Sequence, residues 1–175
     1  MGTPVLRPEL ILFDLDETLL PTAALVEARH SGVSQSLGAV PAYSTIDLHV
    51  GIDTVVRDLI TIARVGVVSS SPRWYVDQVL ADHLNGIDFS VVVTYDDVTH
   101  IKPHPEPLLT ALTLARVDIE AAVYVGDALV DWEACAAIGM TFFAAGWANG
   151  AAFPEEVRVL EDPDELLRML GAAGG

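Results

Sequence analysis

The sequence predicts an α/β domain in which a central parallel sheet of five strands is covered by helices on both faces. Five apolar runs have strand length, at about 10–13, 66–68, 91–94, 122–125 and 141–144. Several runs are continuous rather than alternating, as in strands that are buried on both faces. Helical patterns lie between the runs, and this alternation indicates parallel strands joined by right-handed crossovers.

Helices are predicted where apolar residues recur at helical spacing. The pair Ser71-Pro72 is typical of an N-cap followed by Pro at the first helical position, and Asn85-Gly86 is typical of a helix end. Further helices are expected at about 54–63 and 165–170. The two clearest apolar stripes consist of Val76, Val79, Leu80, His83 and Leu84, and of Leu108, Leu109, Leu112 and Ala115.

The length of 175 residues fits one domain with a full-sized core. We therefore predict that residues 1–175 form a single domain, without repeats or a second domain. Its irregular part is 21–51, where a helix at about 23–30 is followed by a stretch rich in Ser, Gly and Pro. This segment is predicted to form a short flap or lid over the end of the first strand. The alternative is a surface loop with no part in catalysis.

The charge balance argues against two classes of partner. Nine basic and 25 acidic residues give a formal net charge of −16, whereas nucleic acids and anionic membranes are bound by clustered Lys and Arg. Neither is expected to be a partner. An anionic substrate gains nothing from this overall field, so a phosphate-binding site needs local devices: a metal ion, a lysine or helix N-termini.

Nothing in the sequence points to secretion or to a membrane span. The single cysteine, Cys135, excludes an internal disulfide framework, and its alanine neighbours indicate a small buried residue. No signal peptide is recognised, so a cytoplasmic protein is expected. The stretch 134–153 is uncharged and long enough for a span. Its glycines and the strand-like run at its centre instead predict a helix end, a strand and a loop.

Two aspartates follow the first predicted strand. On a strand, residues i and i+2 point the same way, so Asp14 and Asp16 are expected to leave the strand end together. Crowding two carboxylates at a sheet end is costly unless a cation or a reaction uses them. The alternative is a solvated Asp-rich turn, which is common after a strand.

Three further groups follow predicted strands. Ser69 and the residues after it form a junction of hydroxyls and free N–H groups that suits an anion, although ordinary helix capping explains it as well. Lys102 precedes a proline-rich turn into a helix, and the alternative there is a solvated surface lysine. Asp127 and Asp131 follow a buried strand; if a helix begins at Asp127, both lie on one face of its first turn. The alternative is that either acid, taken by itself, only interacts with the positive end of the helix dipole.

Together these groups are more informative than each is alone. All follow strands of a presumed parallel sheet, where ligands bind at the carboxyl ends. Three or four acids at that edge need a cation, and hard oxygen ligands suit Mg²⁺. A lysine and a hydroxyl then suit a phosphoryl group, and the first aspartate can act as a nucleophile that forms an aspartyl-phosphate.

In order and residue type these groups resemble the haloacid dehalogenase-like superfamily of hydrolases, especially its phosphoglycolate-phosphatase-like members. The resemblance extends from about residue 10 to residue 170 and implies a three-layer Rossmann-like fold. The matching residues are Asp14-Leu15-Asp16-Glu17-Thr18 for the first motif, Ser69 for the strand-end hydroxyl, Lys102-Pro103 for the lysine motif, and Gly126-Asp127 with Asp131 for the acidic motif.

The resemblance implies a role for each matched residue. Asp14 is the expected nucleophile, and Asp16 the expected acid that protonates the leaving group and then activates water. Ser69, the N–H of Ser70 and Lys102 are the expected phosphate-binding groups, and Lys102 also neutralises Asp14. The expected Mg²⁺ ligands are a carboxylate oxygen of Asp14, the backbone carbonyl of Asp16, the carboxylate of Asp127, and Asp131 directly or through water.

The predicted function is therefore a Mg²⁺-dependent phosphatase for a phosphorylated small molecule or a larger phosphorylated substrate. The resemblance also implies that dehalogenation is not expected, because the true haloacid dehalogenases of this superfamily lack the aspartate that corresponds to Asp16. A phosphotransferase or phosphomutase of the same fold is one alternative, and a non-catalytic phosphate- or partner-binding protein is another. The segment 21–51 is too short for the helical cap of related phosphatases, so an open site is expected. A homodimer is one way in which a second subunit could complete it.

Overall fold

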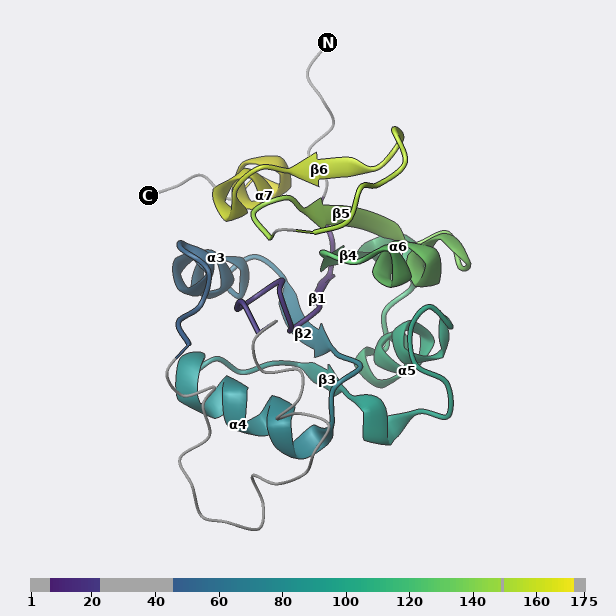
Figure 1. Ribbon diagram of the computed structural model, residues 1–175, viewed down its shortest axis with the longest axis horizontal. Helices are drawn as coiled ribbons and strands as arrows, with labels where there is room; N and C mark the ends of the chain where they lie inside the picture. The colour runs from purple at the N-terminus through teal and green to yellow at the C-terminus, as the bar shows by residue number, and fades with distance from the viewer. Residues whose placement is uncertain (1–6, 23–45, 149, 172–175) are drawn as a thin grey trace.

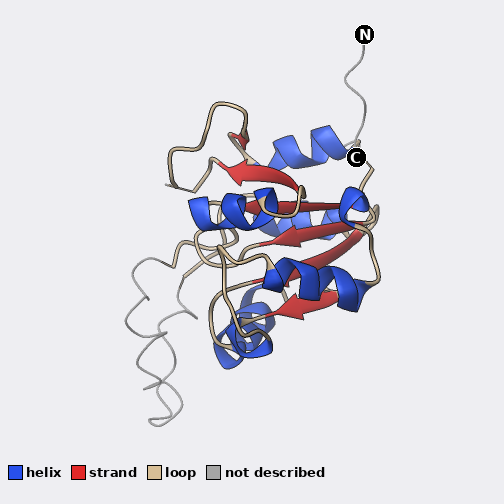
Figure 2. Cartoon of the chain, turned by 90° about the vertical axis from the view of Figure 1, so that its right-hand side faces the viewer, coloured by secondary structure: helices blue, strands red, loops and turns tan. Residues whose placement is uncertain are grey.

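The computed structural model describes residues 7–22, 46–148 and 150–171, whose strands form one parallel sheet. The sheet has six strands in the order β3-β2-β1-β4-β5-β6, one more than the five predicted. All its strands point the same way, so that their carboxyl ends lie along one edge (Figure 2). The strands are β1 Leu10–Phe13, β2 Arg64–Val68, β3 Val91–Val93, β4 Ala122–Gly126, β5 Thr141–Ala145 and β6 Arg158–Leu160.

The five predicted strands are confirmed, and the additional strand is β6. It is only three residues long and lies at the sheet edge against β5. Two of its residues, Arg158 and Val159, are exposed, so the sequence shows neither an apolar run nor a buried alternation there. A short edge strand is held by backbone pairing more than by buried side chains, which is why its sequence signal is weak.

Helices cover both faces of the sheet, as the sequence predicts. Figure 1 shows α3, α4 and α7 on one side of β1, and α5 and α6 on the other. Alternate residues of β1 enter the two cores: Ile11 and Phe13 pack with the first set of helices, and Leu10 and Leu12 with the second. The helices are α3 Ile52–Leu59, α4 Arg73–His83, α5 Glu106–Ala115, α6 Leu129–Ala136 and α7 Pro163–Leu170.

The predicted start of α4 is one residue too early, and the condition considered for Asp127 is not met. The N-cap of α4 is Pro72 rather than Ser71, and the Ser71 hydroxyl donates instead to Asp16. The helix after β4 begins at Leu129, with Ala128 as N-cap, and not at Asp127. Ser71 is thereby turned to Asp16, whereas Asp127 lies before the helix and accepts from the Thr18 hydroxyl. The helix predicted at 23–30 and most of the predicted flap lie outside the described residues.

Within the described ranges, no helix is both long and apolar enough to cross a membrane. The uncharged stretch that begins at residue 134 contains the end of α6 and then β5, as predicted. Cys135 is buried on α6, where it packs with the core on the α5 and α6 side of the sheet. Burial raises the pKa of the Cys135 thiol well above the usual range, and the nearby Asp131 charge raises it further. The thiol is therefore protonated and is a poor nucleophile.

Candidate active site

The sheet register brings the predicted site residues together. β1 lies between β2 and β4, and its last residue, Phe13, pairs with Val67 on one side and Val125 on the other. The chain segments that leave these strands therefore start side by side at the carboxyl edge of the sheet. The N–H of Asp14 still donates to the carbonyl of Val125, at 2.9 Å, which fixes the start of the first acidic segment.

Lys102 lies at the centre of the site, buried to 3% side-chain exposure. Its Nζ is 2.7 Å from Oδ1 of Asp14 and 2.6 Å from Oδ1 of Asp131. The same ammonium donates to the Tyr124 hydroxyl at 2.8 Å and to the carbonyl of Val68 at 3.2 Å. We call Asp14, Lys102, Tyr124 and Asp131 the inner wall. A lysine buried this deeply and paired this way is not the solvated surface residue of the alternative interpretation.

The start of α6 holds Asp131 in the inner wall. The N–H of Ala128 donates to its Oδ2 at 3.1 Å, so both of its carboxylate oxygens have partners. Gly126 makes room for this side chain, because a Cβ at that position would lie 2.5 Å from Oδ2 of Asp131. The glycine before Asp127 is thus required by the close approach of the second acid.

Asp127 brings a third carboxylate to the same place. Thr18, which follows the first strand, donates its hydroxyl to Oδ1 of Asp127 at 2.9 Å. One carboxylate oxygen each from Asp14, Asp127 and Asp131 lies within 4.8 Å of the others. These are hard oxygen donors of the kind that Mg²⁺ takes in proteins, and they outnumber the single ammonium beside them. The residues present therefore fit a divalent cation.

The acidity of these groups reflects the same crowding. Burial raises the pKa of Asp14, an effect that Lys102 opposes and the charges of Asp131 and Asp16 reinforce. Burial, with a further contribution from Asp131, raises the pKa of Asp127 to about 6 despite the Thr18 hydrogen bond. Lys102 is shifted too: burial disfavours its ammonium, but Asp131 and Asp14 outweigh this and raise its pKa above the usual range. A bound cation is the change that relieves such repulsion.

Asp16 has different surroundings, although it is only two residues from Asp14. Ser71 donates its hydroxyl to Oδ2 at 2.5 Å, while Tyr75 and Thr22 donate to Oδ1, each at 2.8 Å. We call Asp16, Thr22, Ser71 and Tyr75 the outer wall. Its named donors are neutral hydroxyls, in contrast to the ammonium of the inner wall.

The serine junction after β2 lies against the same space. Ser69 is buried, and its Oγ accepts from the N–H of Ser71 at 3.0 Å. A cavity of about 360 Å³ opens at this edge of the sheet. Both walls and the serine junction line it, through Asp14, Asp16, Ser70, Ser71, Lys102, Asp127 and Asp131 among others. It has room for a phosphoryl group and a small leaving group.

Three further polar or aromatic residues, Arg73, His104 and Trp147, have partners outside the acid cluster. Arg73 forms an ion pair with Asp97 and donates to the carbonyl of Val92. His104 is exposed on the loop before α5. Trp147 donates its indole N–H to the carbonyl of Thr18 at 2.9 Å and packs against the core.

Sequence reasoning missed Tyr75, Tyr124 and Thr22, and it gave Thr18 no role beyond its place in the first motif. Tyr124 lies within an apolar strand run and Tyr75 within a helix stripe, so both resemble core residues in the sequence. Their hydroxyls identify them only when the acids are placed beside them. A buried tyrosine usually finds a hydrogen-bond partner, and this was the one available signal.

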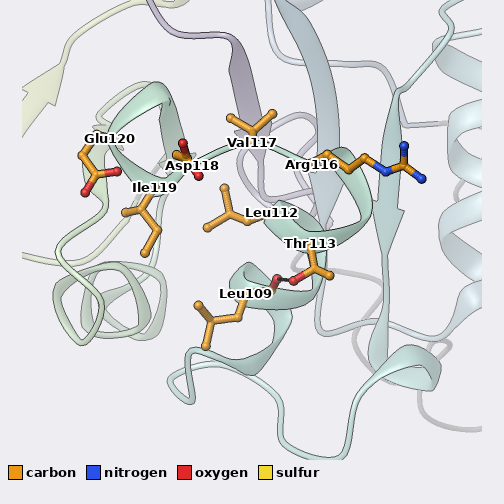
Figure 3. A pocket seen from close by; sticks show the side chains of 8 residues that line it. All are labelled: Leu109, Leu112, Thr113, Arg116, Val117, Asp118, Ile119 and Glu120. Atoms are coloured by element: carbon orange, nitrogen blue, oxygen red, sulfur yellow. Dashed lines mark hydrogen bonds between the residues drawn. The ribbon is translucent and has the colours of Figure 1, made fainter.

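A second cavity, of about 520 Å³, lies away from these acids. Figure 3 shows Leu109, Leu112 and Ile119 gathered around it, with Arg116 directed away. It is formed by the end of α5 and by the turn Ile119–Ala121 that enters β4. This is the amino edge of the parallel sheet, opposite the edge where such folds bind ligands. The smaller cavity with the acids is therefore the candidate active site.

Comparison with known proteins identifies relatives of this chain. A sequence model described as haloacid dehalogenase-like hydrolase matches residues 42–145, more than half of the chain. Pyrophosphatase PpaX of Bacillus mycoides is 36% identical over 118 residues, 64% of this chain and 54% of the relative. The protein of the same name from Bacillus cereus is 38% identical over 113 residues, 61% of this chain and 51% of the relative. The chain thus spans about half the length of these curated relatives.

Solved structures give the same fold. CbbY from Rhodobacter sphaeroides, in complex with phosphate, has a TM-score of 0.76 at 20% identity, covering 94% of this chain and 99% of that one. A HAD-superfamily hydrolase, subfamily IA, variant 1, from Geobacter sulfurreducens also has a TM-score of 0.76 at 20% identity, over 94% and 97% of the chains. The family match begins after Asp14 and Asp16, so the roles of these two residues depend on the geometry described above.

Proposed function

This chain belongs to the haloacid dehalogenase-like hydrolase family, and on that premise we propose that it is a Mg²⁺-dependent phosphatase that acts through an aspartyl-phosphate. The observation that carries the proposal is the position of Asp14. Its carboxylate lies on a cavity at the carboxyl edge of the sheet, 2.7 Å from a buried lysine and beside two further acids. A buried charged cluster of this kind is retained for chemistry more readily than for stability.

Asp14 is the proposed nucleophile. Lys102 contacts its Oδ1, so Oδ2 is the oxygen available to attack phosphorus. The new bond from Oδ2 to phosphorus forms as the bond from phosphorus to the leaving oxygen breaks, and the product is a mixed anhydride on Asp14. Water then attacks the same phosphorus, and the carboxylate of Asp14 is regenerated as inorganic phosphate leaves.

Asp16 is the proposed general acid and base. It gives a proton to the leaving oxygen in the first step and accepts one from the attacking water in the second. Hydroxyls suit this change of state, because they can donate to the carboxylate and can also accept from the carboxylic acid once it is protonated. The three hydroxyls of the outer wall therefore fix the direction of Asp16 without fixing its charge.

Lys102, Ser69 and the N–H of Ser70 are the proposed phosphate-binding groups. The ammonium of Lys102 neutralises charge on Asp14 before attack and on the phosphoryl oxygens during it. Asp131 holds this ammonium in place from the other side, at 2.6 Å. In phosphoryl transfer the protein contributes mainly positioning and electrostatic stabilisation, which is what these fixed groups supply.

The proposed Mg²⁺ ligands are Asp14, the backbone carbonyl of Asp16, and Asp127, with Asp131 as a ligand directly or through water. When bound, the cation supplies positive charge that offsets the negative charge of the phosphoryl group and of the acids. Burial is the main cause of the raised pKa values of Asp14 and Asp127, and the neighbouring carboxylates add to it.

Inorganic pyrophosphate is a second candidate substrate. It is favoured by the two PpaX relatives, whose name gives this activity, and it is small enough for the cavity. In this case the leaving group is phosphate, a weaker base than an alkoxide, so the demand on Asp16 as an acid is lower.

We also propose that the chain works as one domain in which 21–51 is a short insert rather than a full cap.

The proposal is tested by measuring phosphate release from an aryl phosphate, a panel of alkyl phosphates and pyrophosphate. Each substrate is assayed with millimolar Mg²⁺ and again with excess chelator. We expect hydrolysis with Mg²⁺ and its loss with chelator. The absence of release from every substrate in the presence of Mg²⁺ would leave a binding protein as the better account, and full activity in chelator would contradict the metal requirement.

A further inference from the structure

A second group of possible metal ligands lies on the surface, outside the candidate active site. His100 and His104 belong to the loop before α5, and Glu106 is the first residue of that helix. One ligand atom from each of the three lies within 4.8 Å of the others. The side chains of His100 and His104 are 61% and 51% exposed and that of Glu106 is 29% exposed, so a metal ion has free access.

The two imidazoles direct the same atom to one carboxylate oxygen. Nδ1 of His100 is 2.8 Å from Oε2 of Glu106, and Nδ1 of His104 is 3.9 Å from it. The rings lie almost face to face, with centroids 4.6 Å apart and planes 33° apart. Nδ1 of His104 accepts from the N–H of Glu106 at 3.2 Å, so its lone pair faces the start of α5 and has to turn from this amide to bind a metal.

These separations are close to those of a metal site. Zinc binds imidazole nitrogen and carboxylate oxygen at about 2.0–2.2 Å, so tetrahedral ligands lie about 3.4 Å apart. The contact of Glu106 with His100 has to lengthen slightly and that with His104 has to shorten slightly. The proton that His100 Nδ1 shares with Glu106 is released to solvent when this nitrogen binds the metal. Exposed side chains on a loop can make such changes by small rotations.

Two backbone N–H groups already hold the Glu106 carboxylate in position. Oε1 of Glu106 accepts from the N–H of Thr99 at 2.8 Å, and Oε2 accepts from the N–H of His100 at 3.0 Å. Backbone donors of this type orient a ligating carboxylate and reduce the entropy that a metal must overcome. They also lower the pKa of Glu106, with the amide of Thr99 as the largest contribution, so the carboxylate is ionised wherever the imidazoles are neutral.

We propose that His100, His104 and Glu106 form a binding site for a divalent transition-metal ion such as Zn²⁺, separate from the Mg²⁺ site. Two imidazoles and a carboxylate suit Zn²⁺, Ni²⁺ or Cu²⁺ and not Mg²⁺, which prefers oxygen ligands and water. With three protein ligands, the ion keeps at least one position for water. The net charge of −16 favours any cation near the surface.

The site has a direct connection to the lysine of the inner wall. His100 and His104 lie two residues before and two residues after Lys102, whose side chain enters the acid cluster. A metal ion that joins both histidines to the first turn of α5 restrains the loop on either side of the lysine. Metal binding is therefore expected to raise the melting temperature, because the ion binds the folded loop and not the unfolded chain.

The test is a calorimetric titration of the full chain with Zn²⁺ in millimolar Mg²⁺, so that the acid cluster is occupied by its own ion. Wild type, His100→Ala and His104→Ala are compared, and His83→Gln on α4 serves as the matched control. We expect one Zn²⁺ per chain in wild type and control, and affinity at least tenfold lower in either alanine variant. Circular dichroism checks that each variant is folded.

A spectroscopic measurement identifies the ligands directly. On addition of Zn²⁺, the imidazole resonances of His100 and His104 should shift, while those of His83 stay in place. Unchanged affinity in both alanine variants, binding abolished by Mg²⁺, or no Zn²⁺ binding by the wild type would each overturn the proposal. None of these results bears on the phosphatase activity, so the two proposals fail independently.

Discussion

The inner and outer walls of the candidate active site hold two aspartates that are two residues apart in entirely different ways. Asp14 contacts the ammonium of Lys102 and lies beside other carboxylates. Asp16 receives hydrogen bonds from the hydroxyls of Thr22, Ser71 and Tyr75. Among the described contacts, the first carboxylate has an ammonium partner, and the second has three hydroxyl donors.

The different partners of Asp14 and Asp16 explain how two aspartates of one short motif can have two chemical roles. A nucleophile has to stay ionised in a buried place, which requires nearby positive charge. An acid and base has to change its charge during the reaction, and a fixed cation beside it would oppose protonation. The two walls meet these opposite requirements with partners drawn from four different segments of the chain.

The largest expected effect comes from removing the nucleophile. Asp14→Asn keeps the shape of the side chain and its contact with Lys102, but the amide cannot form the phosphoryl anhydride. Turnover of every substrate should fall by roughly 10³-fold or more. The measurement is kcat with a folded, Mg²⁺-loaded variant, and near-normal turnover would remove Asp14 from the mechanism.

A substitution in the outer wall should have an effect that depends on the leaving group. With Asp16→Asn, an alkyl phosphate loses the proton that its leaving oxygen needs, a loss of roughly 10²–10⁴-fold. A nitrophenyl phosphate needs little protonation in the first step, so its phosphorylation rate should fall much less. Pre-steady-state release of nitrophenolate measures that step. Equal losses for both ester types would refute the general-acid role.

Tyr75→Phe tests the orientation of Asp16 while leaving both acids in place. Loss of the hydroxyl that donates to Asp16 at 2.8 Å should reduce kcat by about tenfold, equivalent to one neutral hydrogen bond. Tyr95→Phe is the matched control, because Tyr95 is exposed outside the cavity. The KM for an aryl phosphate should change little in either variant. A loss of stability without a loss of kcat would show that Tyr75 only supports the core.

The smallest effect is expected at Asp97, which lies in neither wall. Partial burial raises its pKa, but hydrogen bonds from the Thr94 hydroxyl and amide, and then the Arg73 charge, outweigh this and lower it. A lowered pKa stabilises the fold above the unfolded value of about 3.9, and this contribution is lost as pH falls through the folded value. Asp97→Asn should therefore cost about 1 kcal/mol at neutral pH.

Thermal unfolding across a pH series checks this expectation. The difference in melting temperature between wild type and Asp97→Asn should shrink as the pH is lowered below about 4. Phosphatase activity of the variant should match wild type throughout. A difference that persists undiminished in acid would show that the lost contribution is packing rather than charge.

The sequence predicts the elements whose signals lie within one short segment, and it predicts less well those that depend on contacts between distant segments. The five predicted strands could be found because continuous apolar runs report burial directly. The edge strand β6 is not, because backbone pairing holds it and Arg158 and Val159 face solvent. The N-cap of α4 was misplaced at Ser71 because its hydroxyl donates to the distant Asp16 instead of capping the helix.

The site shows a similar division. Strand-end position predicts that Asp14, Lys102, Asp127 and Asp131 gather at one edge, and the structure brings them together. The alternation rule predicts that Asp14 and Asp16 leave the strand end together, and both line the same cavity, but β1 ends at Phe13 and a turn follows Asp16 at residues 17–19. The two carboxylates consequently have different partners. The supporting tyrosines could not be found, because their role depends on contacts between residues far apart in the chain.

The most direct test of the two-wall account is to trap the phosphorylated protein. Asp16→Asn is mixed with an aryl phosphate labelled at phosphorus, quenched in acid at short times, and digested for mass analysis. Because the first step proceeds while water is no longer activated, the account predicts label accumulating on the peptide that contains Asp14, and none in the double variant with Asp14→Asn. Label on another residue, or hydrolysis by the wild type with no labelled protein at any time, would contradict it.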